Sequence, residues 1–269
     1  SDGSAEHLEN EFPEIRLIRN SRNLGFAKAN NQGIMASSGR YICLLNSDVV
    51  ILENCLEELC DFLNSHPKVG LVGPKLLNAD GTIQHSAAGL PKPWNTLCRA
   101  LALDTLFPRI ECFGGYLMKY REISETQPVE VVYGALWGTT RQALEQVGLL
   151  DEQFFFFGED LDWCKRFHDA GWNIVYLPSA QAIHYGGASS SKKPTKFYIE
   201  KERSALQYWR KHYGIYGYLY FFFISVIRDV LRVFGYSVSW LLFSSSRENA
   251  KYMVSRSYSN LKWMVTHRQ

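Results

Sequence analysis

The chain has 269 residues, of which 46% are hydrophobic, so it is long enough to bury a sizeable core in one large domain or two small ones. Its formal net charge of +2 gives no global field that would attract nucleic acid, and no nucleic-acid partner is expected. The six cysteines contain no CxxC pair, which indicates reduced thiols of a cytosolic protein rather than a disulfide framework or a zinc site.

Strand-like and helix-like segments alternate through the first third of the chain. The polar start is helix-like, and no strand precedes it. Short apolar runs at 15–18, 41–45 and 69–72 predict strands, and apolar positions at helical spacing over 26–38 and 53–65 predict the helices between them. This pattern predicts an α/β fold with a mostly parallel central sheet flanked by helices.

The alternation becomes irregular after residue 78. An Asn-Ala-Asp-Gly turn signal precedes 82–86, which is expected to be one arm of a hairpin. Prolines, glycines and aromatic residues without a clear period follow, and they predict an excursion over the sheet at 91–127. The remaining expected elements are a strand at 129–136, a helix at 139–147, a helix at 159–170 and a strand at 172–177.

The C-terminal part is rich in aromatic residues, above all between 213 and 243. Its longest charge-free stretch, 213–227, is shorter than the roughly 20 residues that a membrane-spanning helix needs. A helix that lies in the membrane interface fits this pattern, because basic residues recur towards the end of the chain. A pair of core helices packed on the main domain is the alternative, and the sequence leaves both open.

Asn46, Ser47 and Asp48 directly follow the apolar run at 41–45. Ligands of open α/β sheets bind outside the carboxyl ends of the strands, so the Asp48 carboxylate is expected in that crevice. A hard cation such as Mg²⁺ is commonly held by one or two carboxylates together with substrate phosphates. An Asx turn that caps the next helix is the alternative.

His184 follows another apolar strand. An imidazole beside a carboxylate suits Mn²⁺ as well as Mg²⁺, although a purely structural histidine is the alternative. The loop at 186–193, which is rich in glycine, serine and lysine, is either a phosphate-binding loop or a plain exposed linker.

Four phenylalanines at 154–157 run directly into a cluster of carboxylates, Glu159, Asp160 and Asp162. The dipole of a helix that begins here stabilises these groups as anions. The aromatic wall limits the access of water, so the stretch is suited to hold a general base. Acidic capping of an ordinary helix is the alternative.

The order of these segments resembles that of family 2 glycosyltransferases with the GT-A fold, in particular the rhamnosyltransferase-like and galactofuranosyltransferase-like branch. The resemblance covers about residues 1–190. It rests on NLGFA (23–27), NNQG (30–33), LLNSD (44–48), DGTIQ (80–84), VGLLDE (147–152), GEDLDWC (158–164), AGW (170–172) and His184.

The resemblance implies roles for individual residues. Asp160 would be the catalytic base with Glu159 beside it, and Asp48 with His184 would contact Mg²⁺ or Mn²⁺. The donor-binding candidates are Asn23, Gly25, Asn30, Asn46 and Asp48. Aromatic faces stack well on sugars, so Trp137 and Trp163 are candidate acceptor-binding residues, with core packing as the alternative.

Family members begin with a strand, a helix and a second strand that precede the segment at which this chain starts. The resemblance therefore implies that residues 1–191 form a GT-A domain that lacks this N-terminal portion. Residues 192–269 are expected to form a helical region that associates with a membrane or packs on the core.

The expected function is that of an inverting, metal-dependent hexosyltransferase in cell-surface polysaccharide synthesis. A nucleotide-diphosphate sugar, with dTDP-rhamnose as the first choice, would donate to a hydroxyl of a glycan or lipid-linked acceptor. The expected location is the cytoplasmic face of the cell membrane, where the protein would be peripheral. A catalytically impaired or non-catalytic sugar- or nucleotide-binding module is the alternative.

Overall fold

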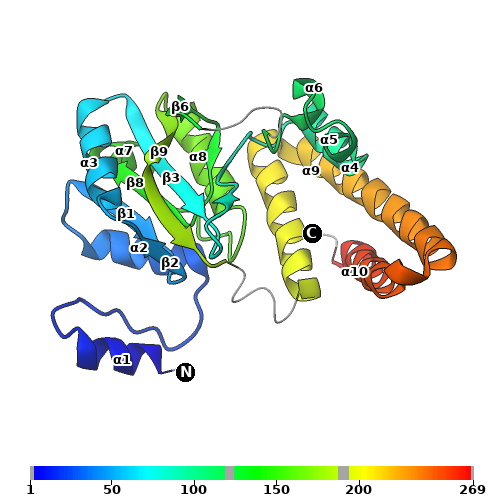
Figure 1. The fold of residues 1–269 in the computed structure, drawn as a ribbon, viewed down its shortest axis with the longest axis horizontal. Coiled ribbons are helices and arrows are strands. Elements are labelled where there is room, and N and C mark those ends of the chain that lie inside the picture. The colour runs from blue at the N-terminus through cyan, green and yellow to red at the C-terminus, as the bar shows by residue number, and fades with distance from the viewer. Residues whose placement is uncertain (1–2, 119–123, 187–193, 268–269) are drawn as a thin grey trace.

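A computed structural model describes residues 3–118, 124–186 and 194–267. An α/β part with a central sheet occupies one side of the molecule, and long C-terminal helices occupy the other (Figure 1). The chain starts with helix α1 (Ser4–Glu11), in agreement with its polar, helix-like sequence.

The main sheet has the strand order β1 (Tyr41–Leu45), β8 (Leu136–Thr140), β3 (Val69–Leu77), β9 (Asn173–His184) and β2 (Val49–Ile51). The sheet is mixed. Its longest ladder, between β3 and β9, is parallel, and the ladders β1–β8, β8–β3 and β9–β2 are antiparallel. The expected α/β fold with a central sheet flanked by helices is confirmed.

Short strands extend this sheet at two places. Strand β4 (Ile83–Gln84) pairs with β3 as the expected hairpin arm, and β6 (Gln127–Pro128) pairs with β9. Strands β5 (Ala87–Ala88) and β7 (Val131–Val132) form a separate two-stranded sheet.

Both faces of the main sheet are buried, and neighbouring strand residues point into different cores. Leu71 and Ile174 face one hydrophobic cluster, whereas Val72 and Val175 face the other. Helix α3 (Cys55–Ser65) covers the second face. The helices that cover the first face are α2 (Phe26–Ala36), α7 (Arg141–Val147) and α8 (Glu159–Asp169).

Three expectations about the secondary structure are wrong. Residues 129–136 are not one strand, because β7 ends at Val132 and β8 begins at Leu136. Residues 15–18 are not a strand, because no neighbouring strand within the described residues pairs with them, and Ile15 and Ile18 are exposed. Residues 91–127 are not irregular throughout. They contain the short helices α4 (Pro93–Ala100), α5 (Leu103–Leu106) and α6 (Glu111–Gly114).

The C-terminal part consists of helix α9 (Pro194–Leu242), a 3₁₀ turn (Ser244–Ser246) and helix α10 (Arg247–Thr266). At Gly214 the backbone has φ 66° and ψ −160°, which breaks α9 into two helical segments set at an angle (Figure 1). Helix α10 folds back along the second segment. Within the described residues, no helix is apolar over enough of its length to cross a membrane.

The first segment of α9 is packed on the α/β part. Leu206, Tyr208 and Trp209 form a buried cluster with Phe154, and Phe221 of the second segment joins it. The aromatic content of the tail therefore serves in part to fasten the helices to the loop that precedes α8.

Candidate active site

Asp48 and His184 are brought together at one end of the main sheet. Asp48 lies in the turn between β1 and β2, and His184 is the last residue of β9, which pairs with β2. The Tyr185 N–H donates a hydrogen bond of 2.9 Å to the Asp48 carbonyl oxygen, which ties the two segments together. The Asp48 Oδ1 atom then lies 3.4 Å from His184 Nε2.

The orientation of the His184 ring is set by Gln84. The Gln84 amide donates to Asn78 Oδ1 at 2.9 Å and to the His184 carbonyl oxygen at 3.2 Å, so its Oε1 atom faces His184 Nδ1 at 2.6 Å. An acceptor at this position requires the proton on Nδ1. Nε2 is then the ring nitrogen that faces Asp48.

A divalent cation fits this arrangement. A carboxylate oxygen and an imidazole nitrogen, which binds a metal when it carries no proton, face each other with partly exposed side chains. Among the described residues, no group of three or more His, Cys, Asp or Glu side chains gathers around one point. Asp48 and His184 therefore supply at most two ligands, and further ones would have to come from a bound diphosphate or from water.

The start of α2 is fitted closely against the loop before α8. Asn23 Oδ1 accepts a hydrogen bond from the Gly25 N–H at 2.9 Å, and the Phe26 N–H donates to the Phe155 carbonyl oxygen at 3.0 Å. Gly25 has φ +84°, and a Cβ atom at this position would lie 2.5 Å from the Phe155 oxygen. This position therefore requires glycine.

The other two donor-binding candidates make local hydrogen bonds. Asn30 donates from its side chain to the Phe26 carbonyl oxygen within α2 at 2.9 Å. The Asn46 N–H donates to the Ala135 carbonyl oxygen at 2.9 Å, and the Asn46 carbonyl oxygen accepts from the Val49 N–H. Asn46 thus shapes the turn that carries Asp48.

Asp160 lies at the start of α8, on the wall of a cavity of about 440 Å³. Gly158, with φ +84°, precedes the helix, and Phe157 lines the same cavity. Helices α4 and α9 supply much of the remaining wall. Glu159 is buried beside Asp160, and its Oε2 atom has no hydrogen-bond partner within the part of the chain that the structure describes.

Burial raises the pKa of both carboxyl groups. For Asp160 the opposing influences are smaller, namely its hydrogen bond with the Leu161 N–H and the positive charge of Lys201. For Glu159, burial and the adjacent Asp160 charge raise the pKa to about 8. Burial thus favours the protonated form of this pair, and Asp160 is the member that lines the cavity.

Asp162, the third carboxylate of the cluster, is fully buried and points away to a different set of partners. Arg166 donates to it at 2.9 Å, and Lys211 and His212 of α9 lie at 2.6 Å and 2.8 Å. Burial opposes the ionisation of Asp162, but the hydrogen bond from His212 and the charges of Arg166 and Lys211 outweigh it and lower its pKa. Asp162 thus joins α8 to α9.

Residues 1–124 match the sequence model of Glycosyl transferase family 2. The N-acetylglucosaminyl-diphospho-decaprenol L-rhamnosyltransferase of Mycobacterium tuberculosis is 29% identical to the chain over 215 residues, which are 76% of this chain and 69% of that protein. The chain thus resembles family 2 rhamnosyltransferases, and its residues 1–124 carry the match to the family model.

The rhamnosyltransferase-like protein shares its fold with solved glycosyltransferases. GalNAc-T7, solved with UDP, GalNAc and Mn²⁺, has a TM-score of 0.50 and 16% identity over 79% of this chain, which spans only 40% of that chain. The mannosyltransferase PcManGT from Pyrobaculum calidifontis, in complex with GDP-Man and Mn²⁺, has a TM-score of 0.50 and 12% identity over 97% of this chain and 75% of that chain. The GT-A fold is confirmed.

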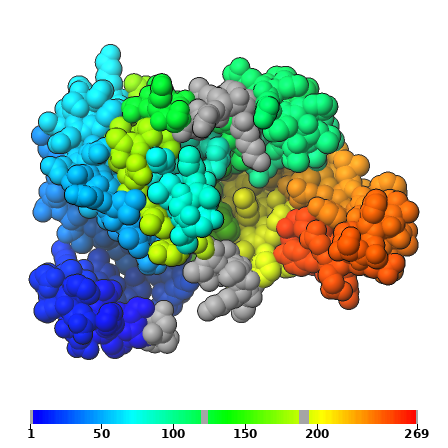
Figure 2. Space-filling model, in the orientation of Figure 1, coloured from blue at the N-terminus to red at the C-terminus, as the bar shows by residue number. Residues whose placement is uncertain are grey.

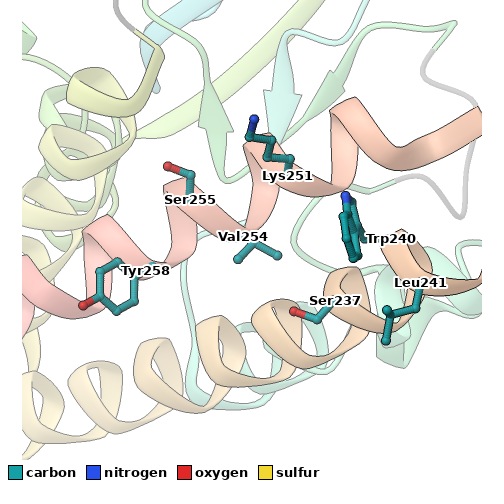
Figure 3. Close-up of a pocket in the computed structure, with 7 residues that line it drawn as sticks. All are labelled: Ser237, Trp240, Leu241, Lys251, Val254, Ser255 and Tyr258. Carbon is teal, nitrogen blue, oxygen red and sulfur yellow. The ribbon is translucent and has the colours of Figure 1, made fainter. Parts of the chain in front are cut away.

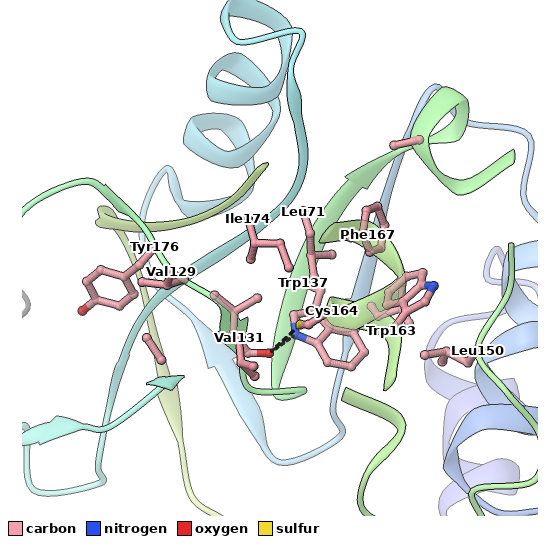
Figure 4. Packing of buried hydrophobic residues seen from close by; sticks show 14 of the residues in the cluster. Leu71, Val129, Val131, Trp137, Leu150, Trp163, Cys164, Phe167, Ile174 and Tyr176 are labelled. Atoms are coloured by element: carbon pink, nitrogen blue, oxygen red, sulfur yellow. Dashed lines mark hydrogen bonds between the residues drawn. The ribbon is translucent and has the colours of Figure 1, made fainter. Parts of the chain in front are cut away.

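The expectation that Trp137 and Trp163 contact an acceptor in this rhamnosyltransferase-like protein is wrong. Both indoles are fully buried, with ring centroids 5.3 Å apart, in the cluster between the sheet and α8 (Figure 4). Their N–H groups donate to the carbonyl oxygens of Val132 and Gly148. Core packing therefore accounts for both residues.

Sequence reasoning did not find the aromatic residues that line the cavity. Most of them lie in helix α9, and no local pattern links that helix to the site. The aromatic residues of the lining are Tyr116, Tyr133, Phe157, Tyr198, Tyr208, Trp209 and Phe221. Four of them belong to α9, outside the part of the chain that resembles the family. The expected loop function at 186–193 concerns positions 187–193, which lie outside the described residues.

Proposed function

We propose that the protein is an inverting glycosyltransferase that moves a sugar from a nucleotide-diphosphate donor to a hydroxyl group of a glycan or lipid-linked acceptor. Rhamnose from dTDP-rhamnose is the proposed donor sugar, because the relative from Mycobacterium tuberculosis is named an L-rhamnosyltransferase. The observation that carries the proposal is the position of Asp160 on the wall of a cavity large enough for a sugar.

The donor is proposed to lie between the β1–β2 turn and the start of α2. Asp48 and His184 would hold Mg²⁺ or Mn²⁺ together with the donor diphosphate, as the facing pair of acceptor atoms suggests. The bound metal would offset the negative charge that develops on the leaving diphosphate. Asn23, Gly25 and Asn30 would contribute to the nucleotide pocket, where the absence of a side chain at Gly25 allows close approach.

Asp160 is proposed to remove the proton from the attacking acceptor hydroxyl. The acceptor oxygen attacks the anomeric carbon from the face opposite to the leaving diphosphate, so a single displacement inverts the anomeric configuration. The raised pKa of Asp160 brings its basicity closer to the operating pH, which favours general-base catalysis.

The C-terminal helices are proposed to hold the protein at the cytoplasmic face of the membrane. Exposed apolar residues follow one another at intervals of three or four along the second segment of α9. This apolar stripe consists of Ile215, Leu219, Phe223, Ile227, Leu231, Phe234, Val238 and Leu242. Burial of such a stripe in the headgroup region is favourable, and a lipid-linked acceptor would be concentrated there.

The end of this helical arm offers further apolar surface. The arm projects from the body of the molecule (Figure 2). Near its end a groove of about 550 Å³ opens between α9 and α10, and Trp240, Leu241, Val254 and Tyr258 line it (Figure 3). Lys251 lies at the same groove, where it could contact anionic headgroups.

The test of the proposed function uses the full chain with dTDP-rhamnose, UDP-sugars and GDP-mannose, in the presence of Mn²⁺ and a membrane extract that supplies acceptors. Transfer of the radiolabelled sugar is expected to fall about 10²–10⁴-fold in Asp160→Asn, because the base is lost. Donor binding, measured by isothermal titration, is expected to stay nearly unchanged.

Asp169→Asn is the matched control, because Asp169 is an exposed residue near the other end of α8. This control variant is expected to retain native transfer. A native rate in Asp160→Asn would refute the assignment of the base. Donor binding without any transfer by the native chain would favour the non-catalytic alternative.

A further inference from the structure

Positively charged side chains gather in the cavity that contains Asp160. Arg99 comes from α4, and Lys201, Arg228 and Arg232 come from α9. The only carboxylates among the residues that line the cavity are Asp160 and Glu202. The cations therefore outnumber the acids in its lining, although the formal charge of the whole chain is only +2.

The four cations differ in how they are paired. Arg228 lies 2.9 Å from Glu202 and 3.2 Å from the buried Asp229, and Arg232 lies 3.9 Å from Asp229. Among the described residues, no carboxylate lies within ion-pair distance of Arg99 or Lys201. Arg228 and Arg232 are thus neutralised by carboxylates, whereas no carboxylate among the described residues pairs with Arg99 or Lys201.

Arg99 and Lys201 are held against aromatic rings instead. The Arg99 guanidinium lies 4.6 Å from the ring centroid of Tyr116, and the Lys201 ammonium lies 5.8 Å from that of Phe157. The Lys201 residue is partly exposed, and desolvation by the cavity wall and the nearby charge of Arg99 lower its pKa, whereas the charges of Asp160 and Glu202 act in the opposite direction. Two cations that repel each other in a partly enclosed cavity are stabilised by a bound anion.

A buried hydroxyl group in the same wall also lacks a partner. Tyr208 is almost fully buried and lines the cavity, and its Oη atom makes no hydrogen bond within the described residues. Buried hydroxyl groups are normally hydrogen-bonded, so a partner supplied by a ligand would satisfy it. This observation does not depend on the charges, and it also indicates that a ligand binds in this cavity.

We infer that Arg99, Lys201 and Tyr208 bind the diphosphate that links an acceptor sugar to a lipid carrier. The inference rests on the proposed function and names the class of acceptor. The acceptor sugar would lie near Asp160, and its anionic linkage would lie against the two cations. The donor diphosphate is assigned to Asp48 and His184 instead, and neither of these residues lines this cavity.

A lipid carrier, rather than a free anion, is favoured by the surface next to the cavity. Phe221, Ile224 and Arg228 line the cavity from the second segment of α9, and the apolar stripe runs along a neighbouring face of this same segment. A diphosphate in the cavity therefore lies close to apolar surface on which a hydrocarbon chain can rest.

Binding of simple probes tests the inference without any sugar transfer. Isothermal titration of the full chain would use farnesyl diphosphate, farnesol and inorganic pyrophosphate. Farnesyl diphosphate is expected to bind most tightly, and the double variant Arg99→Met/Lys201→Met is expected to weaken it at least 10-fold. Arg203→Met is the matched control, because Arg203 is exposed on α9 and does not line the cavity.

Each probe can overturn the inference in its own way. Equal binding of farnesol would mean that the site takes only the hydrocarbon, and equal binding of pyrophosphate would mean that it takes a free anion. Competition of farnesyl diphosphate with dTDP would place the donor diphosphate here. Unchanged binding in the double variant would exclude both cations. If the chain binds farnesyl diphosphate but transfers no sugar, the proposed function is refuted, whereas the inferred diphosphate site is supported.

Discussion

Neutralisation of Asp162 tests how the catalytic helix and the C-terminal helices are joined. In Asp162→Asn the shape of the side chain is kept, but the charge that faces Arg166, Lys211 and His212 is lost. Asp162 has no exposed side-chain surface, whereas these three partners retain exposed side-chain fractions of 20%, 32% and 9%. The variant therefore removes the charge that these three groups share, although Lys211 keeps Asp151 at 2.6 Å and Arg166 keeps two backbone carbonyl acceptors.

The expected loss in the free energy of unfolding is about 2–4 kcal/mol. Removal of one partner from a buried ion pair costs about 3–5 kcal/mol, and partial access of the partners to water reduces this cost. Asp169→Asn is the matched control on the same helix, since Asp169 pairs with Lys165 at the surface. Loss of an exposed pair of this kind costs only about 0.3–0.5 kcal/mol.

Denaturant unfolding followed by tryptophan fluorescence measures both variants. The lowered pKa of Asp162 adds a pH signature, because the folded state binds fewer protons than the unfolded state below the ordinary value of 3.8. Its stabilisation is thus present above that pH and is lost as the pH falls through the lowered pKa. Asp162→Asn should lack this acid-dependent loss. Equal effects of the two variants would refute the role of Asp162 as the junction.

Four further outcomes are expected. Gln84→Leu should raise the Mn²⁺ concentration needed for half-maximal transfer about 10–100-fold, since the Nδ1 proton of His184 loses its acceptor. Excess EDTA should abolish transfer. Transfer that is unaffected by both the substitution and EDTA would contradict the metal site. Gly25→Ala should cost about 1–3 kcal/mol of stability by strain, whereas Gly33→Ala, which meets no atom within 4 Å, should not. Glu159→Gln should lose less thermal stability than the native chain between pH 5 and 9, because a carboxyl whose pKa rises from 4.5 to about 8 makes stability fall as the pH rises through that window; parallel pH curves would refute the shift. Phe223→Asp should release the chain from anionic liposomes in sedimentation assays, and a native chain that never sediments with them would refute the membrane proposal.

Sequence patterns predicted β1, β3 and the first half of β9, because strands with two buried faces appear as short apolar runs between turn signals. They did not predict β2. Local patterns placed Asp48 and His184 at strand ends, and the resemblance to family 2 glycosyltransferases implied that the two residues act together. The antiparallel flanks of the sheet could not be read in this way. Whether two strands pair parallel or antiparallel depends on which segments become neighbours in the sheet, and the sequence of one strand does not contain this information.

The cavity shows a different limit of sequence reasoning. Trp137 and Trp163 were expected at a sugar, but an indole in a strand or helix has the same sequence signature whether it packs in a core or faces a ligand. The residues that line the cavity from α4 and α9 lie up to 72 positions from Asp160 in the sequence. Those of α9 come close to Asp160 because Asp162 and the aromatic cluster around Phe154 hold α9 against the α/β part. Long-range packing of this kind leaves no local pattern.

The bend at Gly214 allows residues from both segments of α9 to line the same cavity. The first segment is fastened to the α/β part, and the second carries the apolar stripe. A membrane that binds the stripe would therefore shift the second segment about Gly214 and change the width of the cavity mouth. Membrane attachment and admission of the acceptor would then be one mechanical event, and a chain in free solution would differ from a docked chain in which acceptors it can admit.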